Sequence, residues 1–142
     1  MVEIIDRYKR LGVELNPSSL PSLRSTLRVN TLKISPEELK SRLEKRGVEL
    51  EPVADLEGAF YYESSFSLSS TIEYLKGYFY LQGLASMLPA RVLLDNGDSC
   101  GSSILDMCAA PGSKASQLAQ LSGDTLPLVA CDSDGRRLQS LE

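Results

Sequence analysis

The spacing of apolar residues divides the first third of the chain into short strands and a helix. Apolar and polar residues alternate over residues 26–32, which predicts a strand, and residues 48–53 predict a second one. Between them, Ser35 is suited to cap a helix that has Pro36 at its first position and Glu38 completing a capping box. A strand, a helix and a strand within 28 residues predict a compact α/β unit.

The predicted helix carries its apolar side chains, Leu39 and Leu43, on one face. Gly47 is well placed to end it, because glycine readily adopts the left-handed conformation that often follows a helix. Upstream, residues 2–11 have apolar side chains at helical spacing, and residues 15–21 contain the Asn, Pro and Ser residues of a loop. We therefore expect a short helix and a loop before the α/β unit.

The pattern becomes less regular after residue 53. Residues 59–63 are apolar and aromatic, which is compatible with a strand, whereas residues 64–70 are polar and typical of a turn. We place the boundary between two modules here. The N-terminal module then covers residues 1–58, and the second module covers residues 59–142.

Residues 72–94 carry Leu, Tyr and Phe at helical intervals, which predicts a helix that bends or breaks near Gly77 and Gly83. Aromatic side chains can stack on RNA bases, but packing of a helix against a sheet is the more common use of such a pattern. Residues 95–102 are rich in Gly, Asp and Ser and predict a turn.

The last part of the chain predicts two parallel strands joined by a helix. Residues 103–105 and 126–131 are apolar runs of strand length, and residues 115–121 have leucines at helical spacing. Between the first strand and the helix, residues 106–114 read Asp-Met-Cys-Ala-Ala-Pro-Gly-Ser-Lys. A strand, a loop of small residues and a helix start together bring backbone N–H groups close to a nucleotide-like ligand.

The composition of this loop fits close contact with a ligand. Ala109, Ala110 and Gly112 leave little side-chain bulk, Pro111 stiffens the turn, and Gly112 adopts angles closed to other residues. By itself, such a loop is equally typical of an ordinary strand-to-helix connection. Asp132 lies 20 positions after Gly112 at the end of the next strand, where a carboxylate can accept hydrogen bonds from both ribose hydroxyls of a ligand. The alternative role for Asp132 is a plain helix cap.

Residues 106–114 resemble the cofactor motif of the Sun (Fmu) family of RNA 5-methylcytosine methyltransferases, whose usual form is Asp-x-Cys-Ala-Ala-Pro-Gly-Gly-Lys-Thr. Residues 27–33 are similar to a segment near the start of the family's shared region, and residues 77–89 to the helix before its cofactor strand. This chain departs from the motif at Ser113, which replaces the second glycine, and at Ala115, where threonine is common.

The resemblance implies an S-adenosylmethionine cofactor and an RNA partner, either tRNA or rRNA. It also implies an α/β fold, with a small N-terminal RNA-contacting module followed by the first half of a Rossmann-like methyltransferase domain. In the family an arginine follows the acidic residue by five positions, which corresponds here to Arg137. The cofactor-binding residues implied are Cys108, Ala109, Ala110, Pro111, Gly112, Ser113 and Lys114 through the backbone, Asp132 through its carboxylate, and Arg137 through its charge.

Methylation of carbon 5 of cytosine needs a cysteine thiolate that adds to carbon 6. In the family these cysteines lie in later motifs, and this sequence ends at Glu142 before them. Cys108, in the cofactor loop, and Cys131, read as a small core residue, are poor substitutes. We therefore expect no catalytic residue in this chain and no activity from it alone. Either a longer enzyme or a partner would complete its two-stranded sheet, whose edge and apolar face are otherwise left open.

Composition excludes several other classes of protein. The chain has no His and its three Cys form no Cys-x-x-Cys pair, which argues against a zinc site and against a disulfide framework. No apolar stretch reaches the roughly 20 residues of a membrane span, and the N-terminus lacks a secretory signal, so a cytoplasmic protein is expected. A generic nucleotide-binding protein is disfavoured because neither Gly-x-Gly-x-x-Gly nor a phosphate-loop Gly-Lys-Ser/Thr motif is present.

Charge is distributed unevenly along the chain. Residues 1–50 contain ten Lys and Arg against seven Asp and Glu, and the remainder contains five against twelve. A basic first module suits contact with RNA, although solvated helix faces give the same pattern. The candidates for phosphate contacts are Arg28, Lys33, Lys40, Arg42, Lys45 and Arg46. The competing hypothesis is a non-catalytic truncated paralogue that binds RNA or a partner methyltransferase.

Overall fold

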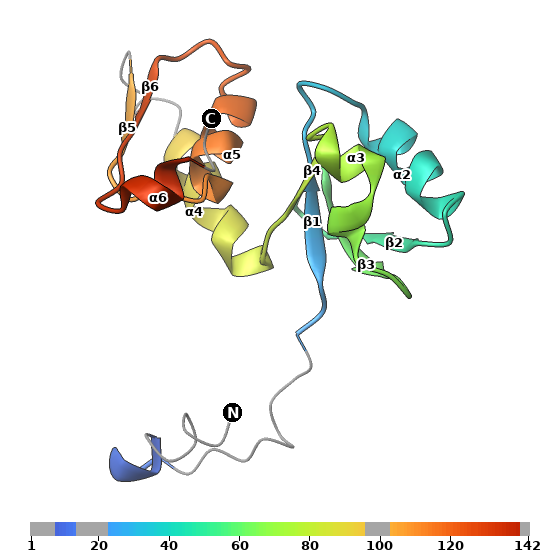
Figure 1. Ribbon diagram of the computed structural model, residues 1–142, viewed down its shortest axis with the longest axis horizontal. Helices are drawn as coiled ribbons and strands as arrows, with labels where there is room; N and C mark the ends of the chain where they lie inside the picture. The colour runs from blue at the N-terminus through green and yellow to red at the C-terminus, as the bar shows by residue number, and fades with distance from the viewer. Residues whose placement is uncertain (1–7, 14–22, 96–102, 140–142) are drawn as a thin grey trace.

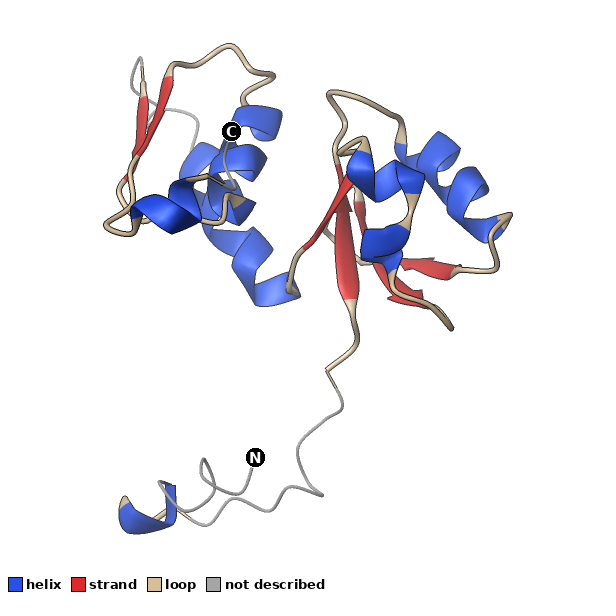
Figure 2. Cartoon of the chain, viewed as in Figure 1, coloured by secondary structure: helices blue, strands red, loops and turns tan. Residues whose placement is uncertain are grey.

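The computed structural model describes residues 8–13, 23–95 and 103–139, and it has the α/β architecture expected from the sequence. Two sheets lie in separate halves of the molecule, each with its own helices (Figures 1 and 2). Most of the helix expected over residues 2–11, the loop over 15–21 and nearly all of the turn over 95–102 lie outside the described residues; residues 8–10 are helical. In the part that is described, no helix has the length and apolar character needed to cross a membrane.

The first sheet has four antiparallel strands in the order β2-β3-β1-β4. The central strand β1 has Leu27 opposite Phe60 on one side and Leu81 on the other. All four residues of β1 are buried, because a central strand has both neighbours and both faces covered. The strands are β1 (Thr26–Val29), β2 (Glu49–Pro52), β3 (Ala59–Glu63) and β4 (Phe79–Leu81).

The helix predicted after Ser35 is confirmed as α2 (Pro36–Glu44). The backbone N–H of Glu38 donates to the Ser35 hydroxyl at 3.1 Å, which satisfies one of the free N–H groups at a helix start. Leu39 and Leu43 are fully buried. Gly47 follows with φ of 83°, a conformation that glycine adopts without steric cost.

The main core lies between one face of this sheet and the helices α2 and α3 (Ile72–Leu75), with the short 3-10 helix η2 (Leu68–Ser70) beside them. The rings of Tyr74 and Phe79 meet edge to face with centroids 5.6 Å apart. These two aromatic residues therefore pack in or against the core, which is the role that the sequence favoured over base stacking. The buried core residues are Leu27, Val29, Ile34, Leu39, Leu43, Val48, Phe60, Leu68 and Phe79.

The helix predicted over residues 72–94 is broken near Gly77 and Gly83, as expected, but part of the segment between the two breaks is a strand. Helix α3 ends at Leu75, Gly77 turns the chain with φ of 66°, and β4 then pairs with β1 before α4 (Leu84–Asp95) begins. Tertiary pairing outweighs the local helical spacing here, because β4 forms backbone hydrogen bonds with the central strand β1. The division predicted at residue 58 likewise falls inside the first sheet, since β3 and β4 belong to it.

The second sheet consists of β5 (Ile104–Asp106) and β6 (Leu128–Ala130), which pair in parallel as predicted. Helix α5 (Ser113–Leu121) is the crossover between them and packs against α4, and the short helix α6 (Gly135–Leu138) follows β6. The core of this half is small and is made of Ala90, Ile104 and Leu118, with partly buried leucines around it.

Helix α4 joins the two halves by packing against the second face of the first sheet. Met87 is 1% exposed and forms a small cluster with Val53 of the loop after β2 and Ala59 of β3. Figure 1 shows α4 and α5 on this side of the sheet, opposite α2 and α3. The second face is therefore at least partly occupied by α4 and α5, which leaves less of the sheet for RNA than a strand-helix-strand unit alone suggested.

The outer face of the second sheet is apolar and open to solvent. Leu105 and Val129 lie opposite each other on β5 and β6 and are 61% and 56% exposed. Met107, at the end of β5, is 71% exposed. Neighbouring exposed apolar side chains on a parallel sheet are unusual, because such sheets are normally covered on both faces.

Replacement of Leu39 by Ala tests the packing of α2 on the first sheet. Because Leu39 is fully buried in the main core, we expect a loss of about 2–5 kcal/mol in the free energy of unfolding, measured by urea denaturation. Leu32→Ala is the matched control, since Leu32 is 49% exposed and should change stability by less than about 0.5 kcal/mol. Equal losses in the two variants would contradict this description of the core.

Candidate cofactor-binding site

The loop between β5 and α5 is fastened to the end of β6 by backbone hydrogen bonds. The N–H of Cys131 donates to the Asp106 carbonyl at 2.7 Å, and the N–H of Ala109 donates to the Cys131 carbonyl at 2.9 Å. Parallel pairing thus continues past the strands and brings the loop beside the residues that follow β6. Gly112 precedes α5 with φ of 108°, which a side chain would make costly.

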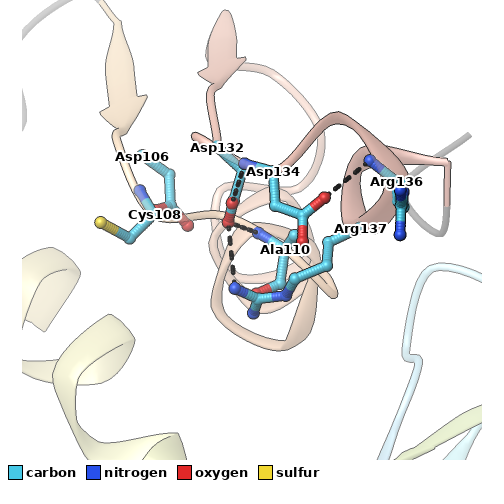
Figure 3. A network of polar contacts seen from close by, with 7 residues as sticks. All are labelled: Asp106, Cys108, Ala110, Asp132, Asp134, Arg136 and Arg137. Atoms are coloured by element: carbon cyan, nitrogen blue, oxygen red, sulfur yellow. Dashed lines mark hydrogen bonds and ion pairs between the residues drawn. The ribbon is translucent and has the colours of Figure 1, made fainter.

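Asp132 lies next to this loop and holds its backbone (Figure 3). Its carboxylate accepts the N–H of Ala110 at 3.1 Å and the N–H of Asp134 at 3.0 Å. The hydrogen bond from the Asp134 amide, followed by the one from Ala110 and the charge of Arg137, holds the pKa of Asp132 below its usual range. The side chain is 5% exposed and is ionised at neutral pH.

Arg137 on α6 reaches back over the same loop. One guanidinium nitrogen lies 3.8 Å from the Asp132 carboxylate, and another donates to the Ala110 carbonyl (Figure 3). Asp134 caps α6 by accepting the N–H of Arg136 at 2.9 Å. The cap of α6 is therefore Asp134, while Asp132 binds the loop and forms a turn with Asp134.

The structure brings together some of the residues proposed for the cofactor and separates others. Ala110, Asp132 and Arg137 form one contact network. Ala109 and Gly112 are buried in the loop, Pro111 is exposed and Ser113 is half-buried at the start of α5. Cys108 is exposed, and its sulfur points away from the network in Figure 3.

Lys114 lies on another side of the loop. It lines a shallow groove of about 200 Å³ together with Asp106 and Met107, and the rest of the groove is apolar. The groove runs between α4, β5 and α5. Lys114 and Arg137 therefore face different surroundings, although both belong to the predicted cofactor site.

Asp106 is a residue of this site that sequence reasoning did not select. One of its carboxylate oxygens accepts the N–H of Cys108 at 3.1 Å, and the other is buried without a hydrogen-bond partner in the described structure. A buried acceptor without a partner is costly, and a ligand that donates a hydrogen bond would relieve that cost. Its place at the carboxyl end of β5, as the first residue of the motif, was the signal that could have identified it.

These features fit a nucleoside cofactor such as S-adenosylmethionine. The loop offers small residues and a helix start, and two carboxylates lie at this edge, since Asp106 ends β5 and Asp132 follows the end of the parallel strand β6 by two residues. Nucleoside hydroxyl and amino groups are hydrogen-bond donors, which suits acceptors placed at this edge. In the described residues, no group of three or more His, Cys, Asp or Glu side chains is arranged to hold a metal ion.

The thiols that the structure describes do not form a catalytic arrangement. Cys108 and Cys131 are both exposed, so the sequence-based description of Cys131 as a core residue is wrong. The strand before it is only partly buried, because nothing in the described chain covers the outer face of the second sheet.

Arg28, proposed from sequence as a phosphate contact, is 5% exposed and is bound between the two halves of the molecule. The other candidates lie on or near α2, and several of them are paired. Lys40 pairs with Glu44, Arg42 with Glu38, and Arg46 with Glu73. Lys33 donates to the Lys76 carbonyl at 3.1 Å, and Lys45 is exposed.

Comparison with known proteins assigns both halves of the chain. A family model described as the N-terminal domain of 16S rRNA methyltransferase RsmF matches residues 14–84. A second, described as 16S rRNA methyltransferase RsmB/F, matches residues 92–142. The junction between the two matches lies close to the start of α4, where the chain leaves the first sheet.

Individual relatives agree with this assignment. The chain is 42% identical over 118 residues to the human 28S rRNA (cytosine(4447)-C(5))-methyltransferase, which covers 82% of this chain and 14% of the relative. It is 41% identical over 122 residues to ribosomal RNA small subunit methyltransferase F of Vibrio atlanticus, which covers 84% of this chain and 26% of that protein. The chain thus spans about a quarter or less of the length of these relatives.

A solved structure has the same fold. The crystal structure of a methyltransferase homolog protein from Pyrococcus horikoshii aligns with a TM-score of 0.74 and 33% sequence identity, over 98% of this chain and 50% of that one. The similarity includes both the four-stranded sheet and the cofactor-loop half. The two family matches, the relatives and this shared fold show that the chain belongs to the Sun family of RNA cytosine-C5 methyltransferases.

Proposed function

We propose that this chain is the cofactor-binding part of an S-adenosylmethionine-dependent enzyme that methylates carbon 5 of cytosine in RNA, with rRNA as the substrate class favoured by its relatives and tRNA as the alternative. The observation that carries the proposal is the loop of residues 106–114, held by Asp132 across the end of two parallel strands. The names of the matched relatives support the rRNA substrate.

The proposed cofactor residues place hydrogen-bond acceptors and donors where the cofactor would lie. S-adenosylmethionine supplies an electrophilic methyl group when it is bound. A carboxylate has about four lone-pair sites, and amide donors occupy two of them on Asp132, so it retains the capacity to accept from a ribose. Asp106 offers a second acceptor, and the first turn of α5 presents backbone N–H groups.

In this proposal Arg137 supports the loop, in place of the direct cofactor contact that the resemblance implies. Its guanidinium lies against Asp132 and the Ala110 carbonyl, so it neutralises the carboxylate and braces the loop. A ribose that takes up lone pairs of Asp132 would share the carboxylate with Arg137. We therefore assign Arg137 to the support of the site, and its contact with a cofactor stays a prediction.

The chemistry at the cytosine ring is assigned to residues outside the described structure. Cys108 lies exposed on the loop, and Cys131 lies exposed after β6. We propose that the 142-residue chain binds the cofactor but does not transfer its methyl group. The exposed pair Leu105 and Val129 supports coverage of the second sheet by further polypeptide, from a longer chain or a partner.

A non-catalytic role remains the second candidate function. The same observations that speak against catalysis by the isolated chain, namely two exposed thiols and an open apolar sheet face, also suit a paralogue that binds RNA or another methyltransferase. The two proposals differ in one measurable respect, which is whether the cofactor loop binds S-adenosylmethionine.

Replacement of Asp132 by Asn tests the carboxylate. The substitution places an amide where two N–H groups donate, so we expect the affinity for S-adenosylmethionine to fall roughly 10- to 100-fold in isothermal titration calorimetry. Asp124→Asn is the matched control, because Asp124 is exposed in the turn after α5, at the far end of that helix from the loop. Unchanged binding by Asp132→Asn would remove Asp132 from the site.

The lowered pKa of Asp132 predicts a pH-dependent contribution to stability. The contacts of the ionised carboxylate contribute fully above its ordinary pKa of 3.8 and are lost as the pH falls through the lower value of the folded protein. The difference in melting temperature between the native chain and Asp132→Asn should therefore be largest near neutral pH and shrink below about pH 4. A difference that stays constant down to pH 2 would contradict the ionised network.

Transfer of labelled methyl groups to rRNA tests whether the chain binds the cofactor without transferring its methyl group. The isolated 142-residue chain should show no transfer above background, while calorimetry under the same conditions detects cofactor binding. Turnover that disappears in a Cys108→Ala or Cys131→Ala variant would contradict the proposal, because it would place the nucleophile in this chain. Absence of both turnover and cofactor binding would favour the non-catalytic alternative.

A further inference from the structure

Arg28 is a buried charged side chain at the centre of the molecule. It lies on the central strand β1, and its guanidinium reaches helix α5 of the other half. One nitrogen donates to the Gln82 side-chain oxygen at 2.9 Å and a second donates to the Ser116 hydroxyl at 2.9 Å. A third donates to the side-chain oxygen of Gln120, one turn further along α5. Ser116 and Gln120 are four residues apart, so Arg28 binds two side chains on the same face of the helix.

The partners of Arg28 are themselves fixed by further hydrogen bonds. The Gln82 amide donates to the Gln117 side chain at 2.9 Å and to the Ser86 carbonyl at 3.1 Å. Gln117 in turn donates to the Met87 carbonyl of α4 at 2.8 Å. These contacts determine which amide atom faces the guanidinium. The network therefore links β1, the end of β4, α4 and α5 in one defined arrangement.

The three side-chain acceptors of Arg28 in the described structure are all neutral. Burial lowers the pKa of Arg28 to about 10, so the side chain is still charged at neutral pH. A buried charge without a paired carboxylate is tolerated only while its hydrogen bonds are intact, because losing one leaves a desolvated donor. A small displacement of α5 is thus penalised more strongly than at an apolar contact.

The position of Ser116 connects this network to the cofactor loop. Its N–H donates to the Gly112 carbonyl at 2.9 Å and its hydroxyl lies 3.3 Å from the Ser113 carbonyl, both at the end of the loop. The hydroxyl of Tyr80, on β4, lies 3.5 Å from the Pro111 carbonyl. The guanidinium of Arg28 lies 6.0 Å above the Tyr80 ring. The first sheet therefore contacts the loop directly through Tyr80, and Arg28 contacts Ser116, which is itself hydrogen-bonded to the end of the loop.

We propose that Arg28 is a positioning residue that locks α5 and the cofactor loop against the central strand of the first sheet, so that binding at the loop also stabilises the N-terminal module. The proposal rests on the proposed function, because it assigns the coupling to the cofactor. It gives the N-terminal module a second task beside RNA contact: it holds the loop at a fixed distance from whatever RNA the module binds.

Hydrogen exchange of the 142-residue chain, with and without S-adenosylmethionine, tests this coupling. In the native chain the cofactor should slow exchange both in α5 and at the buried β1 amides of Leu27 and Val29, by about tenfold or more at saturation. The Arg28→Met variant keeps an apolar stem but removes the charge. In this variant the cofactor should slow hydrogen exchange only in the half that contains α5 and the second sheet. Arg42→Met is the matched control, since Arg42 is an exposed cation of the same module, and it should behave as the native chain does.

Slowing of β1 exchange by the cofactor in a folded Arg28→Met variant would overturn the proposal. Should that variant fail to fold, the pair Ser116→Ala and Gln120→Ala removes the two acceptors on α5 while Arg28 stays in place, and the same loss of coupling is expected. Coupling that persists in the folded double variant would equally overturn it.

Failure of the cofactor assignment gives a different result. If S-adenosylmethionine slows exchange nowhere in the native chain, the proposed function fails, and urea unfolding followed separately in the two halves then decides the role of Arg28. Coincident transitions in the native chain that separate in Arg28→Met would support the positioning role. Coincident transitions in both proteins would overturn it.

Discussion

The parallel pairing of β5 with β6 is the constraint on which the candidate site depends. Parallel strands end at the same edge of a sheet, so Asp106 pairs with Ala130, two residues before Asp132, and both carboxylates come to the same edge although they are 26 positions apart in the sequence. Pairing continues into the loop through the backbone of Ala109 and Cys131, and this places the Ala110 amide within reach of Asp132. The loop thus has its shape because the strand on one side and the carboxylate on the other both hold its backbone.

The junction between the two halves uses a different kind of interaction. Elsewhere in the core, apolar side chains pack and tolerate small shifts, whereas the junction adds to its apolar cluster around Met87 one guanidinium and three amide or hydroxyl acceptors with fixed directions. Such a network costs more to bury than leucines would, and it specifies one arrangement of the halves more sharply. The proposed function, in which the cofactor loop and an RNA-contacting module serve the same nucleotide, would require that precision.

The elements predicted correctly from the sequence are those whose signals are local. The cap at Ser35, the burial of Leu39 and Leu43 and the turn at Gly47 all depend on neighbours within one helical turn or on the freedom of glycine. The local spacing of residues 79–81 is helical, and only pairing with β1 makes them a strand. Arg28 is likewise a residue type that usually lies on the surface, yet here it is buried. No local sequence pattern distinguishes a buried arginine from an exposed one.

The sequence by itself determined the family and the order of strand, loop and helix around Gly112, because its motif is local and because small residues and a glycine at positive φ are requirements of the local backbone. The tertiary structure decided which side chains meet there. It paired Arg137 with Asp132, left one oxygen of Asp106 without a partner, moved Cys131 to the surface and turned Arg28 toward α5. These outcomes depend on contacts between residues far apart in the chain, and their energies come from burial and pairing that exist only once the two sheets and their helices have packed.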